Sequence, residues 1–433
     1  MVRLRRRVLT PALLVLTAAL AVACTPTSTP KPPPTAGATV SVLGLWSGPE
    51  LDSFMKVKSA WEDQTGAKVD WQGTQNLAET LTAAIQAGNP PDIAVLPNPG
   101  LMHQLARNGS LAPLDSVLDK GQVTKDYAPA WLDLGSDSGK LYGLFYKVTD
   151  KSTVWYNPKA FTAAGYKVPT TWDGMVALAD KMVADGRTPF SVVAPASPAA
   201  GWALTDWVSQ IVLTSCGPDL YDAWVAGKTP WTDPCIRRSF DRFDQIVRRP
   251  RYVLGGAQGI LSTTDAAGSY PMYTDPPTAY MYYMASFAQA FIASQYPKLT
   301  PGKDYDAFAF PTIDPDHDGA VMIGADLIVM VKDTPAARSF MTYLAGAQSQ
   351  KTWIALGGFT SVNRSVPLDT YPDSVARSIA QDLADAPAVR FSAGDTMPAS
   401  VQRAWWNAMT QLVQDTTQLD TILQSLSDAA RGG

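Results

Sequence analysis

The first third of the chain alternates between short β-branched apolar runs and segments with an apolar residue at every third or fourth position. The first pattern predicts strands, and the second predicts amphipathic helices. Strands are predicted at residues 39–43, 68–71 and 92–96, and helices between Ser47 and Gly66 and at residues 77–87 and 101–107. Strands alternating with helices indicate an α/β fold with a parallel sheet.

Beyond residue 111 the pattern is less regular, although several segments keep apolar positions at helical spacing. Helices are predicted at residues 172–185, 205–213, 236–248, 335–344 and 401–413. A chain of 433 residues with 46% hydrophobic residues can bury more than one core, so two or more lobes are expected.

Polar and aromatic residues follow the predicted parallel strands. They are Trp46, Ser47, Asn76 in the loop 74–76, and Asn98. Ligands of such sheets bind beyond the carboxyl ends of the strands. One aromatic ring and several neutral hydrogen-bonding groups suit an uncharged polyhydroxy ligand better than a charged one.

The N-terminus has the pattern of an export signal. Arginines at positions 3, 5, 6 and 7 precede an apolar segment at 8–23, which is too short to span a bilayer comfortably. Ala21 and Ala23 ahead of Cys24 resemble the lipobox of bacterial lipoproteins, in which the cysteine becomes the lipid-modified N-terminus; the alternative is plain secretion with a coincidental cysteine. We therefore expect a signal peptide at 1–23 and a lipidated, proline-rich tether at 24–37.

Charge and composition exclude several functions. Residues 1–23 hold four arginines and no acidic residue, so their removal changes the formal charge from −4 to −8, which argues against nucleic-acid binding. The two histidines exclude a three-histidine zinc site. The 13 Trp and 16 Tyr are mostly core residues by default, but exported proteins also use such rings to stack on sugars.

Three cysteines are present. If Cys24 is lipidated, Cys216 and Cys235 remain as a pair in an oxidising compartment, and we expect a disulfide between them, with two buried thiols as the alternative.

Several short motifs recur together in one known family. In the first half of the chain they are WEDQTGAKV (61–69), GNPPDI (88–93), GKLYG (139–143), VWYN (154–157) and PTTWD (169–173). In this order and spacing the chain resembles the family 1 extracellular solute-binding proteins of ABC sugar importers. Further stretches are similar to the alpha-glucoside-binding branch: TDWV (205–208), GPDLYDAW (217–224), YMYYMASF (280–287) and DYDAFAFP (304–311).

The resemblance implies a periplasmic-binding-protein fold, with two α/β lobes and a ligand cleft between them. Crossings between the lobes are expected near 142–154, 310–314 and 344–362. The implied N-terminal lobe is 38–145 plus 312–350, and the implied C-terminal lobe is 146–311 plus 351–433.

The resemblance also implies the ligand contacts. Position by position they are Trp46, Ser47, Asn98, Trp202, Asp206, Phe287, Gly324 to Asp326, and Trp406. Many relatives place a tryptophan where this chain has Phe287. For Asp206 and Asp326 the alternative role is a helix cap or a hinge salt bridge. Trp405 and Trp406 point about 100° apart on a helix, so one of them is expected in the core, and Trp406 is assigned to the cleft.

Two rival chemistries can be weighed. Residues 314–319 (DPDHDG) resemble the start of a calcium loop, but the twelfth position is Ala325 instead of a bidentate acid, so we expect an acidic turn and no metal. A secreted glycoside hydrolase would need two carboxylates at a set separation, which 39 acidic residues can always provide. Neither a G-x-S-x-G elbow nor a Walker phosphate loop is present.

The resulting prediction is a monomeric, non-enzymatic lipoprotein without cofactors, anchored outside the cell. It would capture an alpha-glucoside-type oligosaccharide or related carbohydrate and deliver it to an ABC permease. The alternatives are the hydrolase, a sugar-sensing receptor, and a binding protein for another polyol or a glycerophosphodiester.

Overall fold

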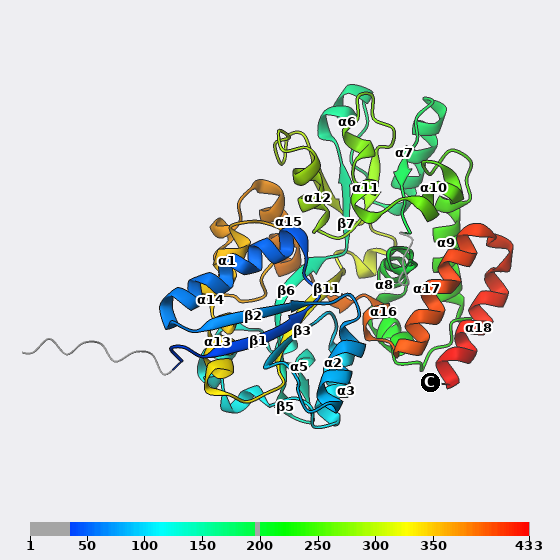
Figure 1. The fold of residues 1–433 in the computed structure, drawn as a ribbon. Helices are drawn as coiled ribbons and strands as arrows, with labels where there is room; N and C mark the ends of the chain where they lie inside the picture. The colour runs from blue at the N-terminus through cyan, green and yellow to red at the C-terminus, as the bar shows by residue number, and fades with distance from the viewer. Residues whose placement is uncertain (1–34, 195–199, 433) are drawn as a thin grey trace, which may run out of the picture.

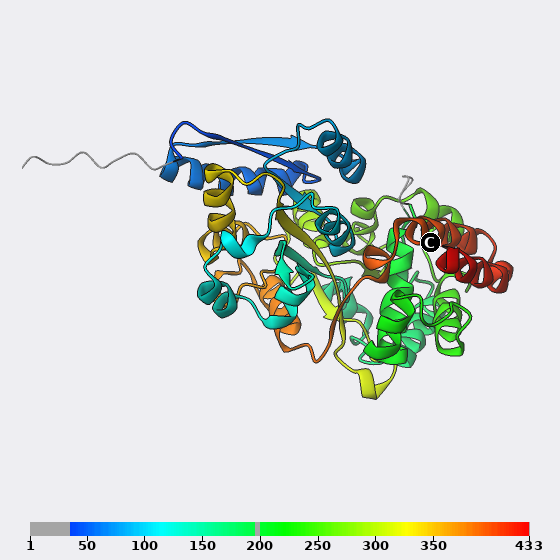
Figure 2. The same ribbon diagram turned by 90° about the horizontal axis from the view of Figure 1, so that it is seen from below.

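The computed structural model describes residues 35–194 and 200–432 and has two lobes, each built on its own sheet (Figure 1). Cys24, the signal peptide and most of the tether lie outside these residues. The N-terminal strand and the C-terminal helices lie at opposite ends of the molecule in both views (Figure 2). Within the described ranges, no helix combines the length and apolar composition that crossing a membrane requires.

The first lobe contains a six-stranded sheet in the order β12-β11-β3-β1-β2, with β6 also paired to β11. As predicted, β1 (Thr39–Gly44) is parallel to both β2 (Lys68–Gly73) and β3 (Ile93–Leu96). The long strand β11 (Val321–Met330) is antiparallel to β3 and to β6 (Gly143–Asp150). β12 (Val389–Phe391) is parallel to β11.

Helices pack on this sheet, and those predicted between Ser47 and Gly66 and at 77–87, 101–107 and 335–344 lie close to their predicted positions. The helices of this lobe are α1 (Gly48–Thr65), α2 (Leu77–Gln86), α3 (Pro99–Arg107), α4 (Lys120–Asp126), α5 (Pro129–Leu134), α13 (Pro335–Ala345) and α14 (Ala347–Ile354), and β4 (Ser136–Asp137) and β5 (Lys140–Leu141) form a separate two-stranded ribbon. α1 ends at Gly66, whose φ of 70° is the left-handed conformation that glycine adopts most easily.

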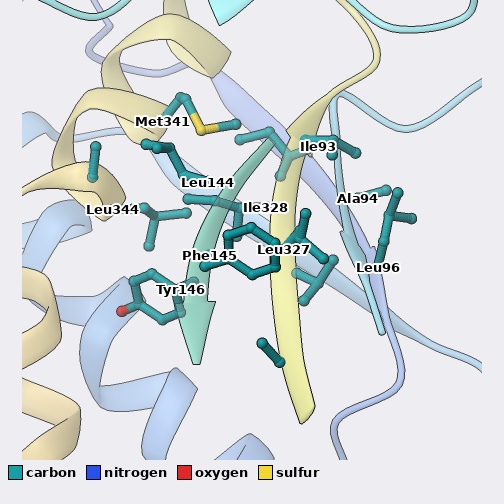
Figure 3. Packing of buried hydrophobic residues seen from close by; sticks show 14 of the residues in the cluster. Ile93, Ala94, Leu96, Leu144, Phe145, Tyr146, Leu327, Ile328, Met341 and Leu344 are labelled. Atoms are coloured by element: carbon teal, nitrogen blue, oxygen red, sulfur yellow. The ribbon is translucent and has the colours of Figure 1, made fainter. Parts of the chain in front are cut away.

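The core of the first lobe joins the central strands to α13. Figure 3 shows Met341 and Leu344 of α13 beside Leu144 of β6 and Ile328 of β11, and all four side chains are buried. Central strands covered in this way hold their carboxyl ends in fixed positions relative to one another.

The second lobe is built on a four-stranded sheet in the order β10-β7-β9-β8. These strands are β7 (Thr153–Tyr156), β8 (Phe190–Ser191), β9 (Met281–Tyr283) and β10 (Asp306–Ala309). Its helices are α6 (Pro158–Ala164), α7 (Trp172–Ala184), α8 (Trp202–Val225), α9 (Pro234–Val247), α10 (Gly256–Ser262), α11 (Asp265–Gly268), α12 (Ala288–Gln295), α17 (Ala399–Gln414) and α18 (Leu419–Gly432).

The helix predicted at 205–213 is much longer in the structure, because two helical segments join across a kink in α8. Gly217 at the kink has a φ of 81°, and Pro218 follows it. A side chain at Gly217 would also meet the ring of His317, since its Cβ would lie 2.6 Å from the nearest ring carbon. Only glycine satisfies both constraints.

The chain passes from the first sheet to the second between Asp150 and Thr153, and returns between Ala309 and Val321. Both passages overlap the crossings predicted at 142–154 and 310–314. The implied C-terminal lobe includes residues 351–433, but Trp353 and Ile354 are buried in the first core, and β12 completes the first sheet. The spacing of apolar positions does not say on which of the two sheets an element packs. The division into lobes by residue number stays a prediction.

The predicted disulfide between Cys216 and Cys235 is confirmed and joins α8 to α9. Replacing both cysteines with alanine should lower the free energy of unfolding by about 3 kcal/mol, because the crosslink closes a loop with a sequence separation of 19. Denaturant titration of both proteins without reductant measures this difference. Unchanged stability of the double variant would contradict it.

Candidate functional site

The C-terminal end of β6 and the residue that follows it present three polar side chains on one face. Lys147, Thr149 and Lys151 alternate with Val148 and Asp150, as a strand requires. On β11, Asp326 is paired with Lys147 and Gly324 with Thr149, whose hydroxyl donates to the Gly324 carbonyl at 3.1 Å. Two lysines and an aspartate are thus placed side by side where the chain passes between the lobes.

Lys147 lies between two carboxylates. Its Nζ is 2.6 Å from Glu50 Oε1 and 3.5 Å from Asp326 Oδ2, and Trp46 Nε1 donates to the same Asp326 oxygen at 2.7 Å. Burial raises the pKa of Asp326, and the Lys147 charge opposes that rise. Burial lowers the pKa of Lys147, but the Asp326 and Glu50 charges outweigh it, so the net shift is upward and the lysine stays charged.

Trp46 is placed differently from the aromatic plate that the sequence suggests. It is only 3% exposed, lies parallel to Trp71 at 5.5 Å between ring centroids, and meets the edge of Trp353 at 4.7 Å. Its observed contacts are core packing and the hydrogen bond that orients Asp326. A ligand role for its ring stays a prediction.

Lys151 occupies the centre of a second group. Its Nζ lies 3.1 Å from both Asp206 Oδ2 and Asp395 Oδ2, and the Ser392 hydroxyl donates to Asp206 Oδ1 at 2.6 Å. Burial lowers the pKa of Lys151, but the charges of Asp206 and Asp395 have the larger effect, so the net shift of this pKa is upward. Since Asp206 belongs to α8 and Asp395 to α16 (Ala393–Thr396), the lysine joins the crossing segment to two helices. This geometry matches the salt-bridge alternative for Asp206.

Two partly buried rings lie beside this group. The Lys151 ammonium is 5.7 Å from the centroid of the Trp202 ring, and Trp202 lies 6.2 Å from Phe287. The backbone of Trp406 packs directly on Gly201, where any side chain would collide with the Trp406 carbonyl. Three predicted aromatic contacts, Trp202, Phe287 and Trp406, therefore come from segments that meet near Lys151.

The adjacent tryptophans of α17 have different environments. Trp405 is fully buried against Trp224 and Trp231, at 5.2 Å and 4.9 Å between ring centroids, whereas Trp406 is partly exposed. Trp405 is therefore the core residue of the two, and the assignment of Trp406 to the cleft stays a prediction.

The remaining predicted residues lie at the ends of the parallel strands. Asn98 Oδ1 accepts a hydrogen bond from the Leu101 backbone at 3.0 Å and so caps α3. Ser47 and Asn76 are exposed at the N-termini of α1 and α2 and make no side-chain capping bond. Gly324 is buried, and the Lys151 side chain packs on it so closely that a Cβ at this position would lie 2.7 Å from Lys151 Cε.

Sequence reasoning missed Lys147, Lys151, Glu50, Ser392 and Asp395. One signal was available for the lysines, because the stretch KVTDK (147–151) places a polar residue at every second position of a predicted crossing. Glu50, Ser392 and Asp395 come from distant parts of the chain, and the sequence alone has no pattern that brings them together.

Two other features are separate from this group of residues. A cavity of about 640 Å³ lies between the α9–α10 loop and the end of α17. No aromatic ring lines it, and two of its three arginines, Arg248 and Arg249, pair with Asp244 and Asp180. In the calcium-like stretch, Asp314 caps a short turn by accepting from the Asp316 backbone at 3.0 Å. Within residues 35–194 and 200–432 no group of three or more His, Cys, Asp or Glu is arranged to hold a metal ion.

Asp150 faces away from the lysine side and is buried at the crossing. Its carboxylate accepts a hydrogen bond from the Ser152 backbone at 2.6 Å, and its own N–H donates to Ser286 Oγ at 3.2 Å. Burial raises the pKa of Asp150 to about 7, since the Ser152 N–H compensates only part of the lost hydration.

Stability should therefore depend on pH through Asp150. In the folded protein the Asp150 carboxyl group keeps its proton up to about pH 7, whereas in the unfolded chain it loses the proton near pH 4. The free energy of unfolding therefore falls as the pH rises from about 4 to 7. Between pH 5 and 8 the free energy of unfolding should fall by on the order of 2 kcal/mol more in the wild type than in Asp150→Asn. Unfolding free energies at both pH values measure this, with the exposed Asp369→Asn as control; parallel profiles for the wild type and Asp150→Asn would contradict it.

The chain thus has a two-lobed fold, with passages between the lobes at 150–153 and 309–321. Its structure is similar to that of the bacterial solute receptor AcbH, which is described as having an exclusive substrate preference for β-D-galactopyranose. The TM-score is 0.79 at 19% identity, and the match covers 92% of this chain and 99% of the other. A chitin oligosaccharide binding protein gives a TM-score of 0.78 at 20% identity, covering 92% and 98%.

Residues 47–351 match the family of bacterial extracellular solute-binding proteins, and the chain belongs to this family. It is 35% identical to the osmoprotective compounds-binding protein GgtB of Synechocystis sp., over 89% of this chain and 92% of the relative. It is 32% identical to the alpha-glucosides-binding periplasmic protein AglE of Rhizobium meliloti, over 89% and 85%. Both relatives are named as binding proteins, and the family match confirms the predicted family.

Proposed function

We propose that this protein is the extracytoplasmic substrate-binding lipoprotein of an ABC importer and captures an alpha-glucoside-type oligosaccharide or a related carbohydrate. The observation that carries the proposal is the group of residues around Lys151, close to the passage between the lobes. Lys151 pairs with Asp206 and lies over the Trp202 ring, Phe287 packs beside Trp202, and the backbone of Trp406 packs on the adjacent Gly201. Asp326 belongs to the neighbouring group around Lys147. Aromatic rings stack on the C–H faces of sugars, and carboxylates accept hydrogen bonds from sugar hydroxyls. The name of the relative AglE, an alpha-glucosides-binding protein, favours the same ligand class.

Ligand binding would act through the arrangement of the lobes. A sugar held between them makes both sets of contacts only when they are closed, so it shifts the open–closed equilibrium toward the closed form. The closed monomer then docks on the permease, whose ATPase supplies the energy for uptake. The binding protein itself requires no cofactor and leaves the sugar uncleaved.

The membrane attachment belongs to the same proposal. Lipid on Cys24 and the proline-rich tether would hold the domain near the permease while leaving it free to rotate. Mass spectrometry of the protein from its own membrane tests this: a diacylglyceryl-modified Cys24 at the N-terminus supports the anchor, and an unmodified secreted chain overturns it.

The ligand proposal is tested by titrating the processed chain with maltose, trehalose, sucrose, maltodextrins, cellobiose and glycerophosphodiesters. Tryptophan fluorescence reports binding, and chromatography of the ligand afterwards reports cleavage. Saturable binding of an intact sugar at micromolar or lower concentration supports the proposal. Cleaved sugar would indicate a hydrolase, and absence of binding across the panel would contradict the assigned ligand class.

A further inference from the structure

The two lysine groups share one composition. Lys147 is placed between Glu50 and Asp326, and Lys151 between Asp206 and Asp395, at N–O distances of 2.6 to 3.5 Å. Four carboxylates therefore share two ammonium groups. Each group, which we call a triad, has a net charge of −1 when all three members are ionised.

Three of the four carboxylates are the accessible parts of these triads. The side chains of Asp326, Asp395 and Glu50 are 20%, 26% and 43% exposed, whereas those of Lys147, Lys151 and Asp206 are 8%, 10% and 7% exposed. A ligand entering here meets carboxylate oxygens first, and the ammonium groups are already occupied by their acidic neighbours.

The triads are also spaced along one face. Lys147 and Lys151 are four residues apart on an extended segment, which corresponds to about 13 Å. Thr149 and Gly324 lie between them in register, and the absence of a side chain at Gly324 leaves room for the Lys151 methylenes. A ligand about two sugar rings long could therefore lie near both negative triads at once.

We propose that this site selects its ligand by charge: it admits neutral and cationic carbohydrates and excludes those that carry a phosphate or carboxylate. The inference rests on the proposed function, because it assumes that the sugar binds beside the two triads. An anionic group there is repelled by partly buried, weakly screened carboxylates, whereas hydroxyl or ammonium donors are attracted. Glycerophosphodiesters are then disfavoured as cargo.

The test compares matched ligands by calorimetric titration of the processed chain. Maltose, trehalose and sucrose are each measured beside their 6-phosphate and their 6-amino-6-deoxy derivative. For the sugar that binds, the phosphate should bind at least about tenfold more weakly, and the amino derivative at least as tightly as the parent.

Two variants separate charge from size. The double variant Glu50→Gln with Asp395→Asn removes two negative charges with little change of shape, and it should reduce the discrimination against phosphate about threefold or more. Asp241→Asn, an exposed carboxylate on α9 that pairs with Arg237, is the matched control and should leave the discrimination unchanged. Melting curves verify that all three proteins are folded.

The outcomes are distinct. A phosphate derivative that binds as well as its parent, or discrimination unchanged in the double variant, overturns the charge selection while leaving the sugar receptor intact. A folded wild type that binds none of the neutral sugars overturns the proposed function, and the charge selection falls with it.

Discussion

Replacing Lys151 with methionine is expected to lower the free energy of unfolding by about 3–5 kcal/mol. The change leaves Asp206 buried without the ammonium group that lies 3.1 Å away, while the Ser392 hydroxyl, which lies outside the triad, still donates a hydrogen bond to the carboxylate. The methionine chain replaces most of the lysine methylenes, so the loss comes from the uncompensated carboxylate and not from packing.

Denaturant titration at neutral pH measures this loss, and two further variants identify its cause. Lys181→Met removes an exposed pair with Asp185 and should cost less than about 1 kcal/mol. Adding Asp206→Leu to Lys151→Met removes the buried charge and should restore a large part of the stability. A single variant as stable as the wild type would show that Lys151 does not stabilise this junction.

Alanine substitutions of the two adjacent tryptophans of α17 should have different effects, one on the stability of the fold and the other on sugar binding. Trp405→Ala is expected to cost about 3–5 kcal/mol, because it leaves a cavity among Trp224, Trp231 and their neighbours. Trp406→Ala should weaken sugar binding by about tenfold or more while changing the unfolding free energy by less than about 1 kcal/mol, because its partly exposed ring is proposed to stack on the ligand.

Each protein is measured by denaturant titration and by sugar titration, and each serves as the control for the other. The two residues share one helix and one residue type, so a general effect on α17 would change both measurements in both variants. Loss of stability without loss of affinity in Trp406→Ala would assign that ring to the core.

The sequence predicts the strands and helices of residues 39–107 well, because local signals agree there with the final packing. Strand β1 is a short, largely buried apolar run, α1 ends at a left-handed glycine, and the connections are short enough that β1 and β2, which are neighbours along the chain, also pair in space. The prediction is weaker where residues that are far apart in the sequence pack against each other. The position of Trp353 in the first core depends on contacts with Trp46 and Phe359, which spacing along the chain does not encode.

The candidate site shows the same limit. Asp206, Asp326, Trp202 and Phe287 were singled out from the sequence and have contacts in one region of the structure. Their partners Lys147 and Lys151 were missed because lysines in a strand are normally solvent-exposed, and only the three-dimensional contacts identify these two as buried. The sequence shows that polar residues alternate along 147–151, but it does not show which carboxylates face them.

The most direct test of the central claim is a crystal structure of the processed protein with the sugar that the titration identifies. The account predicts one sugar between the lobes, stacked on Trp202 or Trp406 and hydrogen-bonded to at least one carboxylate of the two triads. A sugar bound elsewhere, for example in the cavity beside Arg248, or one that contacts a single lobe and neither tryptophan, would contradict it.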